Sequence, residues 1–269
     1  MNAVNNSAKP AKRAPRLLTV KAAWRITPNM IRVTLHGADL HEIAEGCEGA
    51  NCKLFLPTPG QPREDFATQL EEGPRPTTRT YTVRYFRKDL GEIDIDFVAH
   101  GDNGPASAWA GQARPGDFCG FAGPGPVKLT SFHADWFLLA ADMSAIPVVA
   151  ATLEAMPRDS IGVAIFEVLD EADRQPIAAP PGVVQHWIVT PESRVPSLRQ
   201  EQMIRDLNWP TGRVQTCIAG ESSVIQGLRR HLQVELGLPR EDTYISGYWK
   251  IGLVEDEHQN MKRQERLSA

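Results

Sequence analysis

The chain has 269 residues, of which 42% are hydrophobic and 23% are charged, and its formal net charge is −4. A chain of this length and composition forms one large globular domain or two of ordinary size. The negative net charge, without a basic stripe, excludes a general nucleic-acid binder. No apolar run approaches the roughly 18 residues of a membrane-spanning helix, so we expect no membrane partner.

Residues 1–15 are polar and basic and have no apolar centre, which excludes a secretory signal and predicts a disordered tail. The four cysteines (Cys47, Cys52, Cys119 and Cys217) lack the spacing of a metal or redox site. We expect each to be a small buried hydrophobic residue. These features predict a reduced, cytoplasmic protein without a structural metal, and nothing in the sequence requires more than a monomer.

Short runs rich in β-branched and aromatic residues alternate with turn residues from residue 16 to residue 129. The predicted strands are Leu17–Ala23, Met30–Leu35, Asn51–Leu56, Thr78–Arg84, Glu92–Val98 and Asp117–Ala122. Strands at this spacing, separated by Gly and Pro, predict a small barrel or sandwich. The polar stretch Thr58–Thr77 is expected to be a surface loop.

The fourth predicted strand carries two arginines and a tyrosine in the run Arg79-Thr-Tyr-Thr-Val-Arg84. Because side chains alternate along a strand, Arg79, Tyr81 and Val83 share one face, and the other three residues share the opposite face. A guanidinium binds phosphate through two hydrogen bonds, and a tyrosine ring stacks on a planar heterocycle.

The segment from His100 to Trp109 contains Gly104-Pro-Ala-Ser107, which predicts the first turn of a helix. A helix N-terminus leaves four N–H groups without helical partners and favours an anion such as a pyrophosphate. Together, the two segments offer the cations, aromatic ring and N–H groups that a phosphate-bearing flat cofactor, such as a flavin nucleotide, requires. An edge strand with solvated arginines, followed by an ordinary capped helix, remains the alternative interpretation.

From about residue 130, apolar strands alternate with helices. Asp135–Ala141 is a continuous apolar run, which is typical of a parallel strand covered on both faces. Further predicted strands are Gly162–Val168, Val184–Val189 and Arg213–Ala219, and the predicted helices are Ser144–Met156, Arg199–Leu207 and Ser222–Leu236. This alternation predicts βαβ units in an open parallel sheet.

Two strand ends in this half are candidate nucleotide contacts, because ligands of such sheets bind at the carboxyl ends of strands. The first reads Ala140-Ala-Asp-Met-Ser-Ala-Ile-Pro147 and lacks the G-x-G-x-x-G fingerprint, but its Asp142 and Ser144 are candidates to cap the following helix. The second is Ala219-Gly-Glu221. Plain strand-to-helix turns are the alternative for both.

With these motifs, the chain resembles the siderophore-interacting protein family, the FAD-dependent ferric-siderophore reductases of the ferredoxin-reductase-like superfamily. The resemblance covers residues 16–257 and rests on the segments above, together with Arg114-Pro-Gly-Asp117, Glu167-Val168 and Gly247-Tyr-Trp-Lys-Ile-Gly252. It implies a six-stranded antiparallel FAD-binding β-barrel in residues 16–129, then an open parallel-sheet α/β domain that binds NAD(P)H in residues 130–252. Residues 253–269 are polar and are expected to form a terminal helix.

The resemblance also implies roles for individual residues. Arg79, Tyr81 and Thr82 would hold the isoalloxazine and phosphates of FAD. The rest of the FAD site would be lined by Arg84, Asp96, Val98, His100, Asp102, Gly104, Pro105, Ala106, Ser107 and Trp109. NADPH or NADH would contact Asp142, Ser144, Ala145, Glu167, Ala219, Gly220 and Glu221, and the flavin would be covered by Tyr248 and Trp249.

The identity of the electron donor stays open at this point. The family more often has Gly-Asp-Glu-Thr where this chain has Ala141-Asp-Met-Ser144, which keeps a ferredoxin as an alternative donor. Glu167, at the end of the second predicted strand of the α/β half, favours a ribose diol over a 2′-phosphate on physical grounds.

The implied reaction passes a hydride from NAD(P)H to flavin and then single electrons to the Fe(III) of a siderophore, releasing Fe(II) for iron assimilation. Such substrates are anionic or oxygen-rich, so a basic rim would steer them, and Lys53, Lys128 and Lys250 are the candidates. Solvated surface lysines are the alternative. Two other functions remain, a general NAD(P)H:flavin or quinone reductase and a non-catalytic siderophore-binding protein.

Overall fold

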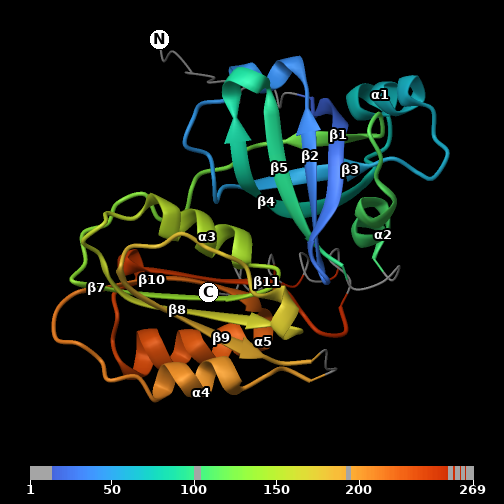
Figure 1. Ribbon diagram of the computed structural model, residues 1–269. Helices are drawn as coiled ribbons and strands as arrows, with labels where there is room; N and C mark the ends of the chain where they lie inside the picture. Colours follow the sequence, from blue (N-terminus) through green and yellow to red (C-terminus); the bar gives the residue numbers. More distant parts are fainter. Residues whose placement is uncertain are drawn as a thin grey trace, which may run out of the picture.

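The computed structural model describes residues 14–99, 104–191 and 195–253, together with residues 257, 261 and 264. Figure 1 shows two stacked units, a closed β-barrel in blue and green above an α/β layer in yellow-green to red. This arrangement confirms the predicted fold class, a barrel followed by an open parallel-sheet layer. None of the described helices combines the length and the apolar character needed to span a bilayer.

The barrel has six antiparallel strands in the order β1-β2-β5-β4-β3-β6. Strand alternation explains its core: on β5, Ile93, Ile95 and Phe97 are fully buried inside the barrel, and the acidic residues between them point outward. The strands are β1 (Arg16–Thr27), β2 (Met30–His36), β3 (Asn51–Leu56), β4 (Thr77–Arg87), β5 (Glu92–Val98) and β6 (Phe118–Ala122). Short helices connect them: η1 (Ala38–Glu42), α1 (Arg63–Glu72), η2 (Lys88–Leu90) and α2 (Pro105–Gln112).

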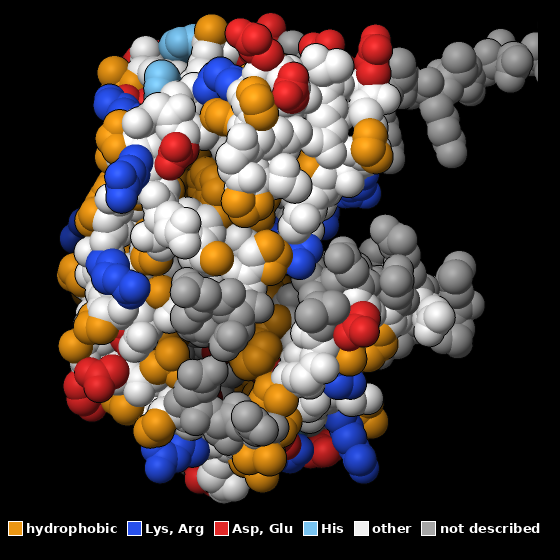
Figure 2. Space-filling model, turned by 90° about the vertical axis from the view of Figure 1, so that its right-hand side faces the viewer, with side chains coloured by type: hydrophobic (Ala, Val, Ile, Leu, Met, Phe, Trp, Pro, Cys, Tyr) orange, Lys and Arg blue, Asp and Glu red, His pale blue; other side chains and the backbone are white. Residues whose placement is uncertain are grey.

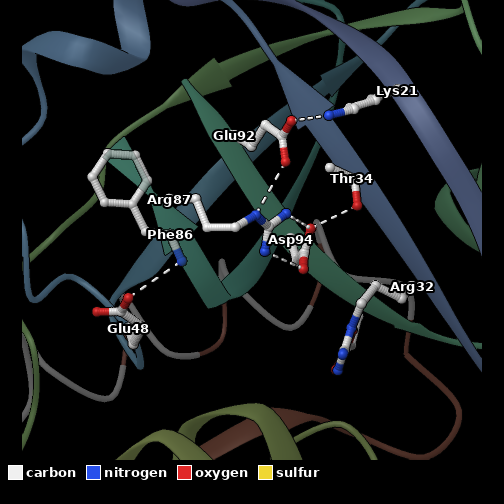
Figure 3. A network of polar contacts seen from close by, with 9 residues as sticks. Lys21, Arg32, Thr34, Glu48, Phe86, Arg87, Glu92 and Asp94 are labelled. Atoms are coloured by element: carbon white, nitrogen blue, oxygen red, sulfur yellow. Dashed lines mark hydrogen bonds and ion pairs between the residues drawn. The ribbon is translucent and has the colours of Figure 1, made fainter. Parts of the chain in front are cut away.

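The outward acidic residues of β5 are also buried, because long basic side chains cover them. Asp94 accepts two hydrogen bonds from the guanidinium of Arg87 and one from the Thr34 hydroxyl. Glu92 pairs with Lys21 and with Arg87, as Figure 3 shows. These ion pairs hold the pKa of the Glu92 carboxyl below its usual range. Ion pairs therefore cover the outer face of β1, β2, β5 and β4.

The prediction of a surface loop over Thr58–Thr77 is wrong, because helix α1 lies within it. Phe66 and Leu70 are buried against Phe55 of β3 and Phe118 of β6. Gly120 of β6 leaves room for this contact, since a Cβ there would approach Leu70 to 2.7 Å. Two apolar residues at helical spacing were thus enough to dock a helix in an otherwise polar stretch.

The α/β layer is a five-stranded parallel sheet in the order β9-β8-β7-β10-β11. Helix α3 covers one face, and α4 and α5 cover the other (Figure 1). The strands are β7 (Trp136–Asp142), β8 (Ile161–Val168), β9 (Gly182–Val189), β10 (Val214–Glu221) and β11 (Thr243–Trp249). The helices are α3 (Ile146–Ala155), η4 (Glu171–Asp173), α4 (Arg199–Arg205), α5 (Ser222–Arg229), the π-helical η5 (Arg230–Glu235) and η6 (Arg240–Asp242).

Strand order reverses between β7 and β10, which are neighbours in the sheet but are separated by two βα units in the sequence. Open α/β sheets bind their ligands at such a switch point, outside the carboxyl ends of the strands. The sequence analysis missed β11, whose Tyr248 and Trp249 were interpreted only as a cover for the flavin.

The two units share a packed interface, with α3 lying between the barrel and the sheet (Figure 1). Met30, in the barrel, is 1% exposed and belongs to the hydrophobic core around α3. The carboxylate of Asp173 in η4 accepts hydrogen bonds from the Thr27 hydroxyl (2.8 Å) and from the backbone and side-chain nitrogens of Asn29 (2.9 and 2.8 Å). The β1–β2 turn is therefore hydrogen-bonded to the α/β layer.

Candidate functional site

Strand β4 presents its two faces to different surroundings, as its alternation predicts. Tyr81 and Val83 pack on the barrel core. On the opposite face, Thr82 lies across from Asn51 of β3, and its hydroxyl is close enough to Tyr248 of β11 to influence the pKa of that phenol. Arg84, on the same face, pairs with Glu154 of α3. This face of β4 therefore borders the α/β layer.

The two sequence segments singled out above meet through aromatic contacts. The ring centroid of Tyr81 lies 4.4 Å from that of Phe97, which lies 5.9 Å from that of Trp109 in α2. Helix α2 starts as predicted, with Gly104 as N-cap and Pro105 in its first turn, and Ala106 and Ser107 are buried. His100 and Asp102, also predicted to contact the cofactor, lie outside the described residues.

Three other barrel residues differ in their surroundings. Arg79 is half-buried and donates a hydrogen bond to the carbonyl of Thr78 (2.9 Å). Asp96 gives both carboxylate oxygens to Arg32 (2.7 and 2.8 Å) on the outer face of the barrel. Arg84 gives two guanidinium nitrogens to Glu154. Asp96 and Arg84, both expected to contact the cofactor, therefore form ion pairs within the protein, and Val98 packs against the core around α3.

The switch point between β7 and β10 brings together the two strand ends that the sequence singled out. Asp142 ends β7, and its carboxylate accepts hydrogen bonds from the backbone and hydroxyl of Ser144 (2.9 and 2.6 Å). Asp142 and Ser144 were candidates to cap α3. Neither does so, because the N-cap is the buried Ala145. Gly220 of β10 must lack a side chain here, since a Cβ would come within 2.8 Å of the Asp142 carboxylate. Its neighbour Ala219 is fully buried.

The acidic residues at this edge bind the end of β11 and the segment that follows it. Asp142 accepts a hydrogen bond from the indole N–H of Trp249 (2.7 Å), and Glu221 accepts one from the backbone N–H of Ile251 (3.2 Å). Glu221 also caps α5 through the backbone N–H groups of Ser223 and Val224. Desolvation raises the pKa of the Asp142 carboxyl, and the neighbouring charge of Glu167 on β8 adds to this rise.

Tyr248 joins the two units at the level of Thr82. Its hydroxyl lies 3.2 Å from that of Tyr244, which precedes it by four residues on the same face of β11. Desolvation raises the pKa of Tyr248 well above its ordinary value, and the Thr82 hydroxyl opposes this rise. The site is thus walled by β4 on one side and by the end of β11 on the other.

The three candidate lysines lie half-buried beside these walls. Lys53, across from Thr80 of β4, donates a hydrogen bond to the Thr80 hydroxyl. Lys128 donates to Asn51 (2.8 Å), which is itself across from Thr82. Lys250 follows Trp249, and its Nζ lies 3.6 Å from the sulfur of Met261. Figure 2 shows Lys and Arg side chains on both edges of the barrel half of the molecule.

The residues present fit a flat, phosphate-bearing cofactor. The partly exposed ring of Tyr81 would offer a flat aromatic surface for stacking, and the Thr82 hydroxyl lies one residue further along β4. The small residues Ala106 and Ser107 would let the backbone at the start of α2 approach a phosphate closely.

Comparison with known proteins identifies the group of proteins to which this site belongs. Residues 19–128 match the model of the siderophore-interacting FAD-binding domain, and residues 134–252 match that of the siderophore-interacting protein. The chain belongs to the siderophore-interacting protein family. The resemblance inferred from the motifs is therefore confirmed, and the barrel is the FAD-binding domain of that family.

Individual relatives match over nearly the whole chain. A ferric vibriobactin reductase of Vibrio cholerae is 34% identical, over 90% of this chain and 92% of that protein. An NADPH-dependent ferric-chelate reductase of Escherichia coli is 30% identical, over 87% and 92%. The crystal structure of a siderophore-interacting protein from Aeromonas hydrophila superposes with a TM-score of 0.80 at 31% identity, covering 95% of this chain and 99% of that one.

The sequence analysis missed several residues that shape this site. Phe97 connects Tyr81 to α2, and it looked like any other core residue of its strand. Glu154 lies in the predicted helix after β7 without a motif around it. Tyr244 is the exception, because its spacing of four from Tyr248 along a strand would have placed both on one face.

Proposed function

We propose that this protein is a ferric-siderophore reductase that uses FAD and accepts its electrons from NADPH or NADH. The observation that carries the proposal is that the face of β4 with Thr82 and Arg84 borders the α/β layer, through Glu154 of α3 and Tyr248 of β11. A flavin held by β4 and α2 would therefore lie beside the switch point of the α/β sheet, where a nucleotide binds. Family membership and the names of the two relatives, both ferric reductases, support the same reaction.

Bound FAD would supply the chemistry, by accepting a hydride and releasing electrons one at a time. The chain would supply the surroundings: Tyr81 offers a ring to the isoalloxazine, Thr82 a hydroxyl, Arg79 a cation, and the start of α2 its N–H groups to the phosphates. At the sheet edge, Gly220 leaves room for the Asp142 carboxylate, which with Glu221 would border a bound nucleotide. Trp249 is 43% exposed beside Asp142, so it shields this region from water only in part.

The substrate side of the proposal is a group of basic side chains. Lys53 and Lys128 stand on the barrel next to Thr80 and Asn51, and Lys250 stands on the other wall. A cationic rim of this kind attracts an anionic or oxygen-rich iron chelate and speeds its encounter with the protein. The steering weakens as salt is added, because exposed charges are screened.

An anaerobic absorbance experiment tests the proposal. The purified protein, reconstituted with FAD, is reduced with NADH or NADPH and then mixed with a ferric siderophore and an Fe(II) trap. We expect bleaching of the flavin spectrum, then its return with matching Fe(II) formation. A flavin that bleaches but does not react with the chelate would favour a general flavin or quinone reductase. Failure to bind FAD would leave a siderophore-binding protein.

A further inference from the structure

The ion pair between Arg84 and Glu154 joins the barrel to helix α3. Two guanidinium nitrogens of Arg84 bind the two carboxylate oxygens of Glu154, at 2.8 and 2.7 Å. The Arg84 side chain is only 4% exposed, and that of Glu154 is 28% exposed. A two-pronged, charge-assisted pair with one partner buried is strongly directional, because the planar fork allows few relative positions of the two groups.

On the barrel side, the guanidinium of Arg84 is itself held in place. It lies 4.0 Å from the centre of the Tyr85 ring, and Arg32 lies 4.8 Å from the same ring. Arg32 is bound through two hydrogen bonds to Asp96 of β5. In Figure 3, Arg32 points away from the Glu92 and Asp94 cluster. An unbroken series of contacts therefore runs from the barrel wall to α3.

Close backbone packing accompanies the ion pair. The N–H of Gly49 donates to the carbonyl of Val83 (2.8 Å), next to Arg84. A Cβ at Gly49 would lie 3.3 Å from the Cβ of Ala151 in α3, and the φ of Gly49 is +80°, which disfavours other residues. Helix α3 thus rests directly on the segment that pairs with β4.

Both partners of the ion pair lie on elements that carry the candidate site. Arg84 is two residues beyond Thr82 on the same face of β4, and Glu154 belongs to the helix that begins after the Asp142–Ser144 turn. A shift between Arg84 and Glu154 would therefore move the flavin side of the site relative to the nucleotide side. Misplacement of reacting groups by about 1 Å can cost about 100-fold in rate.

We propose that Arg84 and Glu154 are positioning residues that set the approach of the nicotinamide nucleotide to the flavin. This inference rests on the proposed function. It replaces the expectation that Arg84 contacts FAD directly, because its fork is already taken up by Glu154.

The test uses Arg84→Lys, which keeps the charge but loses the fork, and Glu154→Gln. Arg213→Lys is the matched control, because Arg213 forms the same two-pronged pair with Asp242 (2.7 and 2.8 Å) inside the α/β layer. For each protein, fluorescence quenching gives the dissociation constant of the apoprotein for FAD. Anaerobic stopped-flow mixing then gives the nucleotide dissociation constant and the limiting rate of flavin reduction.

We expect Arg84→Lys and Glu154→Gln to lower the limiting reduction rate at least about 10-fold, while the dissociation constants for FAD and nucleotide change less than about 3-fold. Arg213→Lys should leave all three quantities within that range. The exchanged pair, Arg84→Glu with Glu154→Arg, should recover part of the lost rate. If Arg84→Lys unfolds, Glu154→Gln still decides, because its side chain is partly exposed and keeps its shape.

Two results would overturn the inference alone. One is a limiting rate in Glu154→Gln equal to that of the wild type. The other is a rise of about 10-fold in the FAD dissociation constant with Arg84→Lys but not with Glu154→Gln, which would make Arg84 a cofactor ligand. A wild-type protein that neither nucleotide reduces would instead overturn the proposed function, and this inference with it.

Discussion

Trp249 and Asp142 are joined by a hydrogen bond of 2.7 Å from the indole N–H to the carboxylate, across the carboxyl edge of the sheet. Their strands, β11 and β7, are not neighbours, because β10 lies between them. The other carboxylate oxygen of Asp142 is held by Ser144. The turn that departs from the family pattern and the aromatic residue that ends β11 are therefore hydrogen-bonded to each other.

Asp142 should make stability pH-dependent in a defined direction. Desolvation raises the pKa of its carboxyl in the folded state, so its stabilising contribution is complete below the unfolded pKa of about 4 and is lost as the pH rises through the folded value. The free energy of unfolding of the wild type, relative to Asp142→Asn, should therefore fall from pH 4 to pH 8. Urea unfolding at several pH values measures it. Parallel pH profiles for the two proteins would contradict the assignment, and Glu171→Gln, at an exposed carboxylate, serves as control.

The burial of Tyr248 should make the protein less stable at high pH. Its pKa is raised far above the ordinary value by desolvation, so the folded state resists its ionisation. Its contribution is intact below the unfolded pKa of about 10 and is lost above it. Tyr248→Phe should cost about 1 kcal/mol at pH 7, through the lost hydroxyl contacts with Tyr244 and Thr82.

Above pH 10 the difference in stability between the wild type and Tyr248→Phe should become smaller or change sign, because the variant has no hydroxyl to ionise at this position. Absorbance at 295 nm follows tyrosine ionisation, and circular dichroism follows unfolding in the same samples. A wild type that ionises all four tyrosines while still folded would contradict this account.

Local patterning predicted most of the fold. The continuous apolar run that ends at Asp142 reflects a strand covered on both faces, and the alternation of β5 reflects a strand with one face in the barrel core. Both patterns can be recognised in the sequence. Helix α1 was missed because only Phe66 and Leu70 anchor it to the barrel, and two apolar residues are too few to show a clear helical periodicity. Strand β11 escaped because Gly247 interrupts it and its polar residues do not resemble a buried parallel strand.

The candidate site was predicted in its motifs and missed in its connections. The motifs singled out Tyr81, Thr82 and the start of α2, and the structure connects Tyr81 to α2 through Phe97. The partners of Arg84 and Asp96 could not be predicted, because Glu154 and Arg32 are distant in the sequence and any of many charged residues could have met them. Pairing at a domain interface depends on the final packing of both domains.

Asp173 should contribute strongly to the joining of the two units. It is fully buried and accepts hydrogen bonds from Thr27, from Asn29 twice, and from the backbone of Asp170. Asp173→Ala would leave these donors unpaired and should lower the free energy of unfolding by about 3 kcal/mol. The neighbouring Glu171→Ala should cost less than about 0.5 kcal/mol, because its pair with Arg174 is exposed. Equal losses in the two variants, measured by urea unfolding, would contradict the role of Asp173.

Glu167 should influence the choice between NADH and NADPH. It is the penultimate residue of β8 and lies across from Asp142, half-buried at the carboxyl edge where the ribose of a bound nucleotide would lie. A carboxylate accepts hydrogen bonds from a ribose diol and repels a 2′-phosphate, and such repulsion between like charges can cost several kcal/mol. Glu167→Gln should therefore raise kcat/KM for NADPH relative to NADH by about 10-fold or more.

Initial rates of reduction of a ferric chelate with each nucleotide give this ratio, and Glu171→Gln again serves as control. The effect should shrink at high salt, because the interaction is electrostatic and partly exposed to solvent. A ratio that the substitution leaves unchanged at low salt would mean that the 2′ position of the ribose lies away from β8. The Escherichia coli relative, named for its dependence on NADPH, shows that a family relative can use that nucleotide. If the ratio of kcat/KM for NADPH and NADH depends on Glu167, this residue determines the nucleotide preference of this chain.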